Sequence, residues 1–420
     1  MDNLLRLVIE DKVILSVQRN DRTMMKLKNL DKDTIRSSNI KLIINLLFNK
    51  RELTKQEISK ETGLSIPTVI NITNELIEDG LVEECGVAES SGGRKPMIVR
   101  FMPNSRCSFG VEINSKYIRI ILINLDAVIL EDESIMFNDS FKLNESNVKD
   151  IFDEICKIIK VIILKRNIKE ANVLGVGFSL PGTVNEEKLL LELAPNLFVK
   201  NMDFHYIEEK LNIKVYVENE ANSAAMAELR LGIAKDMRNL VYISVREGVG
   251  TGIVVSGYLY KGKNKRAGEF GHMTVEKDGV PCTCGKKGCW EVYTSSEVIL
   301  KKYNMEEKNP IYSFDQFFNL LDEKDFKAST IWEEYLEYLA IGIQNIILIM
   351  DPHYIVIGGD ISNYERFLIP PLKDRIFKDI NFFSEDDLKL LTSRFKDDSS
   401  IIGAAILPIE KLFFINERIL

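Results

Sequence analysis

Three of the six cysteines in this 420-residue chain lie within eight positions, shortly after one of its three histidines. The segment reads Gly268-Glu-Phe-Gly-His272 and, ten positions on, Cys282-Thr-Cys284-Gly-Lys-Lys-Gly-Cys289-Trp-Glu291. Three thiolates and one imidazole complete a tetrahedral ligand set, which leaves no open position for a catalytic water. We therefore predict a structural Zn2+ site, with the ligands His272, Cys282, Cys284 and Cys289.

The same cysteines could instead be reduced core residues or form a disulfide. Cys282 and Cys284 are too close in sequence for an easy bridge, and the other three cysteines are scattered singly, as in a reducing compartment. Gly285 and Gly288 supply the tight turns that wrap a metal. The carboxylates of Glu269 and Glu291 flank the cluster, and a fixed pair of acidic side chains suits a ligand with hydroxyl groups.

Length and composition indicate two or three domains with substantial cores, because 45% of the residues are hydrophobic. No apolar run reaches the roughly 18 residues needed to cross a membrane, and residues 1–20 alternate apolar and charged positions, unlike a secretory signal. These observations predict a cytoplasmic protein. The net charge is -8, yet residues 25–106 carry 13 Lys and Arg against 11 Asp and Glu. Only this N-terminal part is therefore suited to approach phosphates.

The N-terminal part has the pattern of a winged helix-turn-helix. Apolar residues at helical spacing predict a first helix over 36–48. Thr54-Lys-Gln-Glu57 is a capping box for a second, short helix that ends at Gly63. Ser65 caps a third helix whose buried stripe carries Val69, Ile72 and Leu76, and two strands are expected at 81–85 and 97–101.

The third helix predicts a DNA-reading surface of short polar side chains, able to meet phosphates and base edges. Arg94 and Lys95, between glycines and Pro96, are placed to enter a minor groove. The predicted DNA contacts are Ser65, Pro67, Thr68, Asn71, Asn74, Arg94 and Lys95. The alternative is a helical bundle that contacts other proteins, since this geometry is also a packing motif.

The domain boundaries follow from these patterns. We expect a winged helix-turn-helix domain at 25–90, a wing or linker at 91–105 and a second domain at 106–420. Residues 1–24 are an N-terminal extension of uncertain role: they form an extra amphipathic helix, or they precede a true start at Met24 or Met25.

The second domain is predicted to be an α/β protein of two lobes with a cleft between them, because a set of hairpin strands occurs twice with helices between. The first set comprises strands at 107–113, 117–124 and 128–136, followed by a helix at 147–165 and strands at 173–178 and 215–217. The second set comprises a strand at 240–244, a glycine-rich segment at 248–252 that leads into a strand at 253–255, a helix at 332–350 and a strand at 354–357.

Four motifs together make the chain resemble the ROK family of bacterial sugar kinases and sugar-responsive repressors, and within it the repressors of xylose utilisation. They are Ser91-Gly-Gly-Arg-Lys-Pro96, Val217-Glu-Asn-Glu-Ala-Asn222, Gly268-Glu-Phe-Gly-His272 and the cluster from Cys282 to Glu291. The resemblance covers residues 30–420. It implies an actin-like (ribonuclease H-like) fold, a sugar between the lobes and a zinc site in the second lobe.

The resemblance also implies sugar contacts, from Gly182, Asn219, Glu220, Glu269, His272 and Glu291. Carboxylates and amides suit paired hydroxyl groups, and a histidine with one nitrogen on zinc is held in one tautomer. The simpler explanation of Asn219 and Glu220 is helix capping, and that of Glu269 and Glu291 is a solvated turn.

Departures at three sequence elements distinguish this chain from the kinases that it resembles. Their phosphate loop reads Asp-x-Gly-x-Thr, whereas the matching stretch here has Glu112 and, in place of the loop glycine, Asn114. Arg246-Glu247 stands where kinases carry Gly-Thr, and a carboxylate there would repel phosphates. Glu220 replaces the catalytic Asp, and a displacement of about 1 Å can cost on the order of 100-fold in rate.

These departures predict a non-enzymatic repressor that binds operator DNA as a homodimer and is released by a monosaccharide. D-xylose is the favoured effector on resemblance, and glucose is a possible one. An ATP-dependent sugar kinase with a DNA-binding head is the alternative. A repressor that answers to a protein partner is a third option, which the retained Glu269, His272 and Glu291 disfavour.

Overall fold

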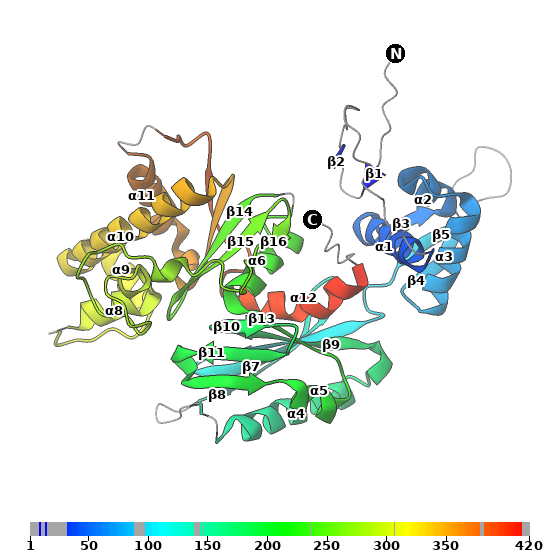
Figure 1. Ribbon diagram of the computed structural model, residues 1–420, viewed down its shortest axis with the longest axis horizontal. Coiled ribbons are helices and arrows are strands. Elements are labelled where there is room, and N and C mark those ends of the chain that lie inside the picture. The colour runs from blue at the N-terminus through cyan, green and yellow to red at the C-terminus, as the bar shows by residue number, and fades with distance from the viewer. Residues whose placement is uncertain are drawn as a thin grey trace, which may run out of the picture. The chain divides into compact units, whose positions relative to one another are not determined.

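The computed structural model describes residues 8–9, 13–14, 32–87, 97–137, 143–144, 146–235, 237–305, 307–378 and 382–413. The chain divides into two compact units, one of Met1–Ser105 with Glu410–Leu420 and one of Arg106–Ile409 (Figure 1). Of the extension at 1–24, only the paired strands β1 (Val8–Ile9) and β2 (Val13–Ile14) are described. The predicted wing contacts Arg94 and Lys95 lie outside the described residues.

The first unit contains the three predicted helices and both predicted strands. These are α1 (Lys32–Lys50), α2 (Lys55–Thr62), α3 (Ile66–Glu78), β4 (Val82–Val87) and β5 (Met97–Phe101). A further strand that the sequence did not predict, β3 (Glu52–Thr54), pairs with β5 and completes an antiparallel sheet in the order β3-β5-β4. This is the winged helix-turn-helix arrangement.

The predicted caps form as expected. The Thr54 hydroxyl accepts from the Glu57 amide, the Glu57 carboxylate accepts from the Thr54 amide, and Gly63 has the left-handed φ of 73° that ends α2. Ser65 caps α3, whose residues Val69, Ile72 and Leu76 are buried against the rest of the unit. The two helices therefore start and stop where their local side chains dictate.

The second unit contains two five-stranded sheets with the same strand order. The first comprises β6 (Cys107–Ile113), β7 (Tyr117–Asn124), β8 (Ile129–Met136), β9 (Val173–Leu180) and β13 (Val215–Asn219), in the order β8-β7-β6-β9-β13. The second comprises β14 (Leu240–Val245), β15 (Val249–Val255), β16 (Tyr258–Leu259), β17 (Tyr354–Gly359) and β18 (Lys389–Thr392), in the order β16-β15-β14-β17-β18.

In each sheet the first three strands form an antiparallel meander, and the fourth and fifth run parallel to the first. We call the parts built on these sheets the first and second lobes. The repeated topology confirms the predicted two-lobed, actin-like α/β fold.

Helices cover both sheets. In the first lobe, α4 (Val148–Lys165) and α5 (His205–Leu211) pack on the sheet and share its main core. In the second lobe, α6 (Glu220–Arg230) packs on one face of the second sheet. The helices α10 (Phe326–Met350) and α11 (Glu365–Phe377) form a separate hydrophobic core with the other face of that sheet. Shorter elements are β10 (Thr183–Asn185), β11 (Leu190–Ala194), β12 (Val199–Asp203), α7 (Glu291–Thr294), α8 (Ser296–Asn304) and α9 (Phe314–Asp322).

The glycine-rich segment at 248–252 differs from the prediction, because β15 begins at Val249 and contains Gly250 and Gly252. The cause is the close packing of α6. A Cβ atom at Gly252 would lie 2.5 Å from the Cβ atom of Ala225, and one at Gly250 would lie 3.0 Å from that of Ala221. These glycines are therefore explained by contact between a helix and a strand.

The last helix, α12 (Ser399–Phe413), begins in the second unit, and its residues from Glu410 belong to the first. Within the first unit, the Phe413 ring lies 5.1 Å from that of Phe48 and 6.1 Å from that of Phe101. The amide of Asn45 donates to the Phe413 carbonyl at 2.9 Å. The helix is thus one continuous element shared by both units. Among the described residues, no helix combines the length and apolar character that crossing a membrane requires.

Within the second unit, α12 packs so closely on the first sheet that β9 needs glycine there. A Cβ atom at Gly177 would lie 1.9 Å from the carbonyl oxygen of Ala404. We expect Gly177→Ala to destabilise this unit by about 2 kcal/mol or more, because the helix must move away from the strand. Urea unfolding measures the effect, with Ser134→Ala on the exposed side of β8 as a control. A native midpoint for Gly177→Ala would contradict the packing.

Candidate metal centre and interlobe site

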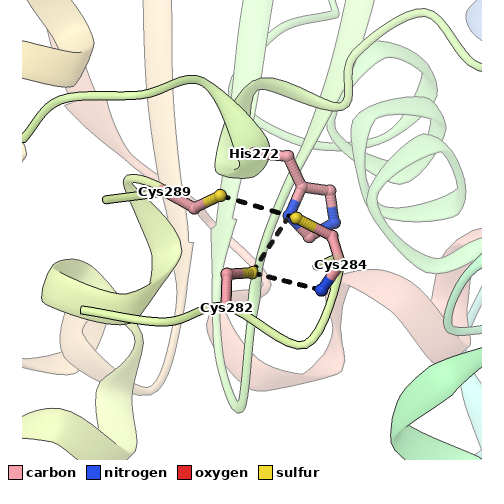
Figure 2. Close-up of side chains that lie close together, drawn as sticks. All are labelled: His272, Cys282, Cys284 and Cys289. Carbon is pink, nitrogen blue, oxygen red and sulfur yellow. Dashed lines mark hydrogen bonds between the residues drawn. The ribbon is translucent and has the colours of Figure 1, made fainter. Parts of the chain in front are cut away.

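The four predicted metal ligands converge. His272 ends a short 3-10 helix (Phe270–His272), Cys282 and Cys284 follow in the next loop, and Cys289 directly precedes Trp290 and α7. Their ligand atoms all lie within 4.8 Å of one another, and Figure 2 shows the side chains pointing toward a common centre. The Sγ atoms of Cys284 and Cys289 are 3.6 Å apart, and Cys282 Sγ lies 3.7 Å from His272 Nδ1.

The Cys284–Cys289 and Cys282–His272 distances are those expected of neighbouring ligands around a tetrahedral ion. With bonds of about 2.3 Å to sulfur and about 2.0 Å to nitrogen, neighbouring ligand atoms should lie about 3.5 to 3.8 Å apart. Three soft thiolates and an imidazole are also the donors that zinc prefers. The residues therefore form a site that could hold a metal ion.

Backbone turns bring the cysteines together. The backbone amide of Cys282 donates to the Lys286 carbonyl. Isolated antiparallel β-bridges of the backbone pair Thr274 with Cys289 and Pro281 with Lys287. Gly288 has a φ of 69°, and a Cβ atom there would lie 1.7 Å from the Glu276 carbonyl oxygen. Glycine is therefore required at this turn for two independent reasons.

The acidic residues beside the cluster differ in role. Glu291 Oε1 accepts from Cys282 Sγ at 2.9 Å and lies 3.1 Å from His272 Nδ1, so this carboxylate faces the ligand set. The Glu291 hydrogen bond raises the pKa of His272. On the other side of the ring, His272 Nε2 lies 4.0 Å from Glu269 Oε2. Burial raises the pKa of Glu269.

The other predicted sugar contacts lie at the start of α6. Asn219 caps this helix, because its Oδ1 accepts from the amides of Ala221 and Asn222, while its Nδ2 donates to the Gly182 carbonyl at 2.9 Å. The capping explanation of Asn219 is thus confirmed, and it leaves a sugar contact open. Glu220 Oε1 accepts from the Ser244 hydroxyl at 3.1 Å.

β15 connects the two groups of predicted contacts. On one side it packs against α6 through Gly250 and Gly252. On the other it approaches the segment from 268 to 272 so closely that a Cβ atom at Gly271 would lie 2.0 Å from the Val249 carbonyl oxygen. The start of α6 and the metal ligand His272 are therefore attached to one strand.

A buried cluster of charges, which the sequence did not predict, joins the two lobes. Arg246 Nη1 of the second lobe lies 2.5 Å from Glu112 Oε1 of the first, and Arg246 Nε lies 3.4 Å from Glu220 Oε1. We call Glu112, Glu220 and Arg246 the interlobe charge cluster. Burial lowers the pKa of Arg246, but the charges of the two carboxylates raise it by a larger amount. The pKa of Arg246 is therefore well above its ordinary value.

A second set of ion pairs also crosses between the lobes. Lys261, which follows β16, contacts both Glu186 and the buried Glu218 of the first lobe. Glu218 belongs to the motif that carries Asn219 and Glu220, and it also accepts from the Asn222 amide group at 3.1 Å. The only signal in the sequence was charge at the end of an otherwise apolar strand.

In the first unit, the predicted polar face of α3 is exposed at Ser65, Pro67, Asn71 and Asn74 and half-buried at Thr68. The Ser65 and Thr68 hydroxyls lie 2.8 Å apart, and Lys55 Nζ lies 3.4 Å from Asn74 Oδ1. Ile66 and Ile70 are 39% and 38% exposed, so the surface includes apolar groups that the sequence analysis did not single out. Such groups can contact thymine methyls.

Comparison with known proteins identifies the class. Residues 108–411 match the ROK family, and residues 36–83 match a winged helix-turn-helix DNA-binding family. The chain therefore belongs to the ROK family and carries a winged helix-turn-helix ahead of its ROK domain.

Individual relatives resemble the whole chain. It is 28% identical over 382 residues to the xylose repressor of Bacillus subtilis, covering 90% of this chain and 97% of the repressor. The crystal structure of a ROK family transcriptional regulator, a homologue of the E. coli MLC protein, is similar with a TM-score of 0.77 and 26% identity, covering 90% and 97% of the two chains. A ROK glucokinase from Streptomyces griseus, in complex with glucose and AMPPNP, shares the fold over 72% of this chain and 98% of its own, with a TM-score of 0.61 and 22% identity.

The thiols predict a distinct order of alkylation in metal-free protein. Burial raises the pKa of Cys107 to about 11, so this thiol stays protonated near neutral pH and should react slowly. Burial also raises the pKa of Cys284, but the Lys286 amide and the neighbouring thiols outweigh it, and this exposed thiol should react first. Mass spectrometry of iodoacetamide-treated protein reads each site.

Added Zn2+ should protect Cys282, Cys284 and Cys289 and leave the half-buried Cys85, an internal control, unchanged. Equal labelling of Cys284 with and without Zn2+ would contradict a metal site at this cluster.

Proposed function

We propose that this protein is a sugar-responsive transcriptional repressor that leaves its operator when a monosaccharide, with D-xylose favoured and glucose possible, binds between the lobes. The observation that carries the proposal is the union of a winged helix-turn-helix with a ROK domain in one chain. Similarity to a xylose repressor over 90% of the chain supports the same assignment. Its place of action would be the cytoplasm.

The DNA contacts would come from the exposed face of α3 and from the wing. Ser65, Pro67, Thr68, Asn71 and Asn74 would read the major groove, with Arg94 and Lys95 in the minor groove. We assign residues 25–90 to the DNA-binding domain, 91–105 to the wing or linker and 106–420 to the sugar-binding domain, whose end from Glu410 groups with the first unit. A homodimer would present two such heads to a near-palindromic operator.

The sugar would be held by two groups of residues, one around the start of α6 and one around the metal ligands. Gly182, Asn219 and Glu220 form the first group, and Glu269, His272 and Glu291 form the second. A structural Zn2+ ion on His272, Cys282, Cys284 and Cys289 would fix the His272 ring, with Nδ1 toward the cysteines and Nε2 toward Glu269. The ion's part is to hold these side chains, and the sugar hydroxyls would bind to the carboxylates and amides.

The interlobe charge cluster supports a sensor over a kinase. Glu112 is 2% exposed and is paired with Arg246, and its carboxylate also accepts from the hydroxyls of Ser400 and Tyr117. Glu247, in the adjoining turn, accepts from Ser115 and pairs with Lys116. A carboxylate-rich, internally paired surface at these two turns is poorly suited to polyphosphate.

Release requires that the sugar bind the conformer of low operator affinity more tightly than the operator-bound one. The helix α12 begins in the sugar-binding unit and its residues from Glu410 belong to the first unit, so we propose that it carries the response along the chain. The proposed response therefore needs a change at the start of α12 and no covalent chemistry.

A gel shift tests the function. The full chain is bound to DNA from upstream of its own gene or of neighbouring sugar genes, and D-xylose, glucose and other aldoses are titrated. We expect D-xylose to release the DNA. Binding that no sugar alters would remove the sugar from the proposal. Absence of binding together with magnesium-dependent ADP release in the presence of sugar would instead establish the kinase alternative.

Glu269→Gln should separate the two activities. The carboxamide keeps the shape of Glu269 but loses its charge, so we expect sugar affinity to fall by about tenfold or more while operator affinity stays native. Isothermal titration and the gel shift measure the two affinities. Glu276→Gln, an exposed position on the same segment, is the control. Equal loss of operator affinity in Glu269→Gln would point to misfolding rather than to a sugar contact.

A further inference from the structure

Arg246 is the one cation of the interlobe charge cluster, and its guanidinium group has three acceptor groups around it. Its side chain is 15% exposed, and it lies between Glu112 of the first lobe and Glu220 at the start of α6. Its second terminal nitrogen donates to the Asp397 carbonyl, just before α12. One guanidinium therefore contacts the first sheet, the start of α6 and the segment that leads into α12.

The partners of Arg246 are themselves held in place. Ser400, in the first turn of α12, donates to Glu112 Oε1 at 2.7 Å, and Tyr117 donates to Glu112 Oε2 at 3.1 Å. Ser244 donates to Glu220 at 3.1 Å. A planar guanidinium with donors on several edges suits such a fixed set of acceptors, whereas an ammonium group would act only as a point charge.

The position of Arg246 in the repeated topology adds a second argument. It directly follows β14, the first strand of the second sheet, while Glu112 lies at the end of β6, the first strand of the first sheet. The hairpin turns that follow these strands also meet, because Ser115 donates to Glu247 at 2.7 Å and Lys116 pairs with Glu247 at 3.1 Å. The two lobes are thus tied together at equivalent hairpins by side chains of opposite charge.

We propose that Arg246 is a positioning residue of the sugar site and that its pairing with Glu112 is a latch that ties the two lobes together and connects Glu220 to the start of α12. The link to sugar rests on the proposed function, whereas the latch between the lobes does not. Arg246 acts through Glu220: it fixes the direction of this carboxylate and supplies its counter-charge. Loss of the guanidinium would leave the buried Glu112 and the half-buried Glu220 without this cation.

The charge balance around Glu220 explains how the latch would affect binding. Burial raises the pKa of Glu220, and the Arg246 guanidinium opposes this rise, while Glu112 and Glu247 add to it. Removal of Arg246 would therefore move protonation of Glu220 to higher pH. A protonated carboxyl accepts fewer hydrogen bonds from hydroxyl groups, so sugar affinity would begin to fall at a higher pH than in the native chain.

The test compares Arg246→Gln, Arg246→Lys, Glu112→Gln and the double variant Glu112→Gln/Arg246→Gln in the full-length protein. D-xylose and glucose affinities are measured by calorimetry between about pH 5 and 8. We expect Arg246→Gln to weaken binding by about tenfold or more and to move the acid limb of the profile to higher pH. Arg246→Lys should keep the native acid limb with partly reduced affinity, because it keeps the charge and loses the planar donor geometry.

Glu112→Gln should weaken binding although Glu112 is not among the proposed sugar contacts, and the double variant should be no weaker than Arg246→Gln alone. Arg366→Gln, which removes an exposed arginine paired with Asp322, should bind as the native chain does. Native affinity together with a native pH profile for Arg246→Gln would overturn the inference. If that variant does not fold, Arg246→Lys and Tyr117→Phe decide, and native affinity in both would overturn it equally.

A native chain that binds no sugar would count against the proposed function instead. The latch is then tested by urea unfolding of the same four variants and the native chain. Non-additive shifts of the midpoint for Glu112→Gln and Arg246→Gln would support it, and strictly additive shifts would overturn it.

Discussion

The packing of α6 on β15 is the contact on which the rest of the second unit depends. α6 leaves the last strand of the first sheet at Asn219, yet its body lies on the second sheet, where Gly250 and Gly252 allow the backbone to approach Ala221 and Ala225. The start of α6 is thereby fixed relative to both lobes. The segment 268–272, which ends at His272, also packs closely against β15. One strand therefore sets the distance between the two groups of proposed sugar contacts.

Ion pairs between the lobes add to this packing. Arg246 with Glu112, and Lys261 with Glu186 and Glu218, join the lobes through pairs of opposite sign, and most of these side chains are largely buried. Buried pairs contribute little net stability compared with apolar packing, but they are costly to break singly and therefore favour discrete arrangements. A protein that answers to a neutral ligand can use such pairs, because a small change in lobe position makes or loses a whole contact.

Much of the fold could be predicted from local signals. The capping box at Thr54, the left-handed Gly63 and the cap at Ser65 determine helix ends by themselves, and the spacing of His272 and the three cysteines was sufficient to predict their convergence. The interlobe charge cluster could not be predicted, because Glu112, Glu220 and Arg246 are far apart in sequence and meet only once both sheets have formed. Gly250 and Gly252 were wrongly placed before the strand, since nothing local shows that a helix lies against them.

In the proposed function, sugar and operator compete through one conformational equilibrium. The most direct measurement is the affinity of the full chain for D-xylose with and without saturating operator DNA, together with operator affinity with and without saturating D-xylose. We expect each ligand to weaken the binding of the other by the same factor, as thermodynamic linkage requires. D-xylose binding of equal strength in the presence and absence of operator would contradict it.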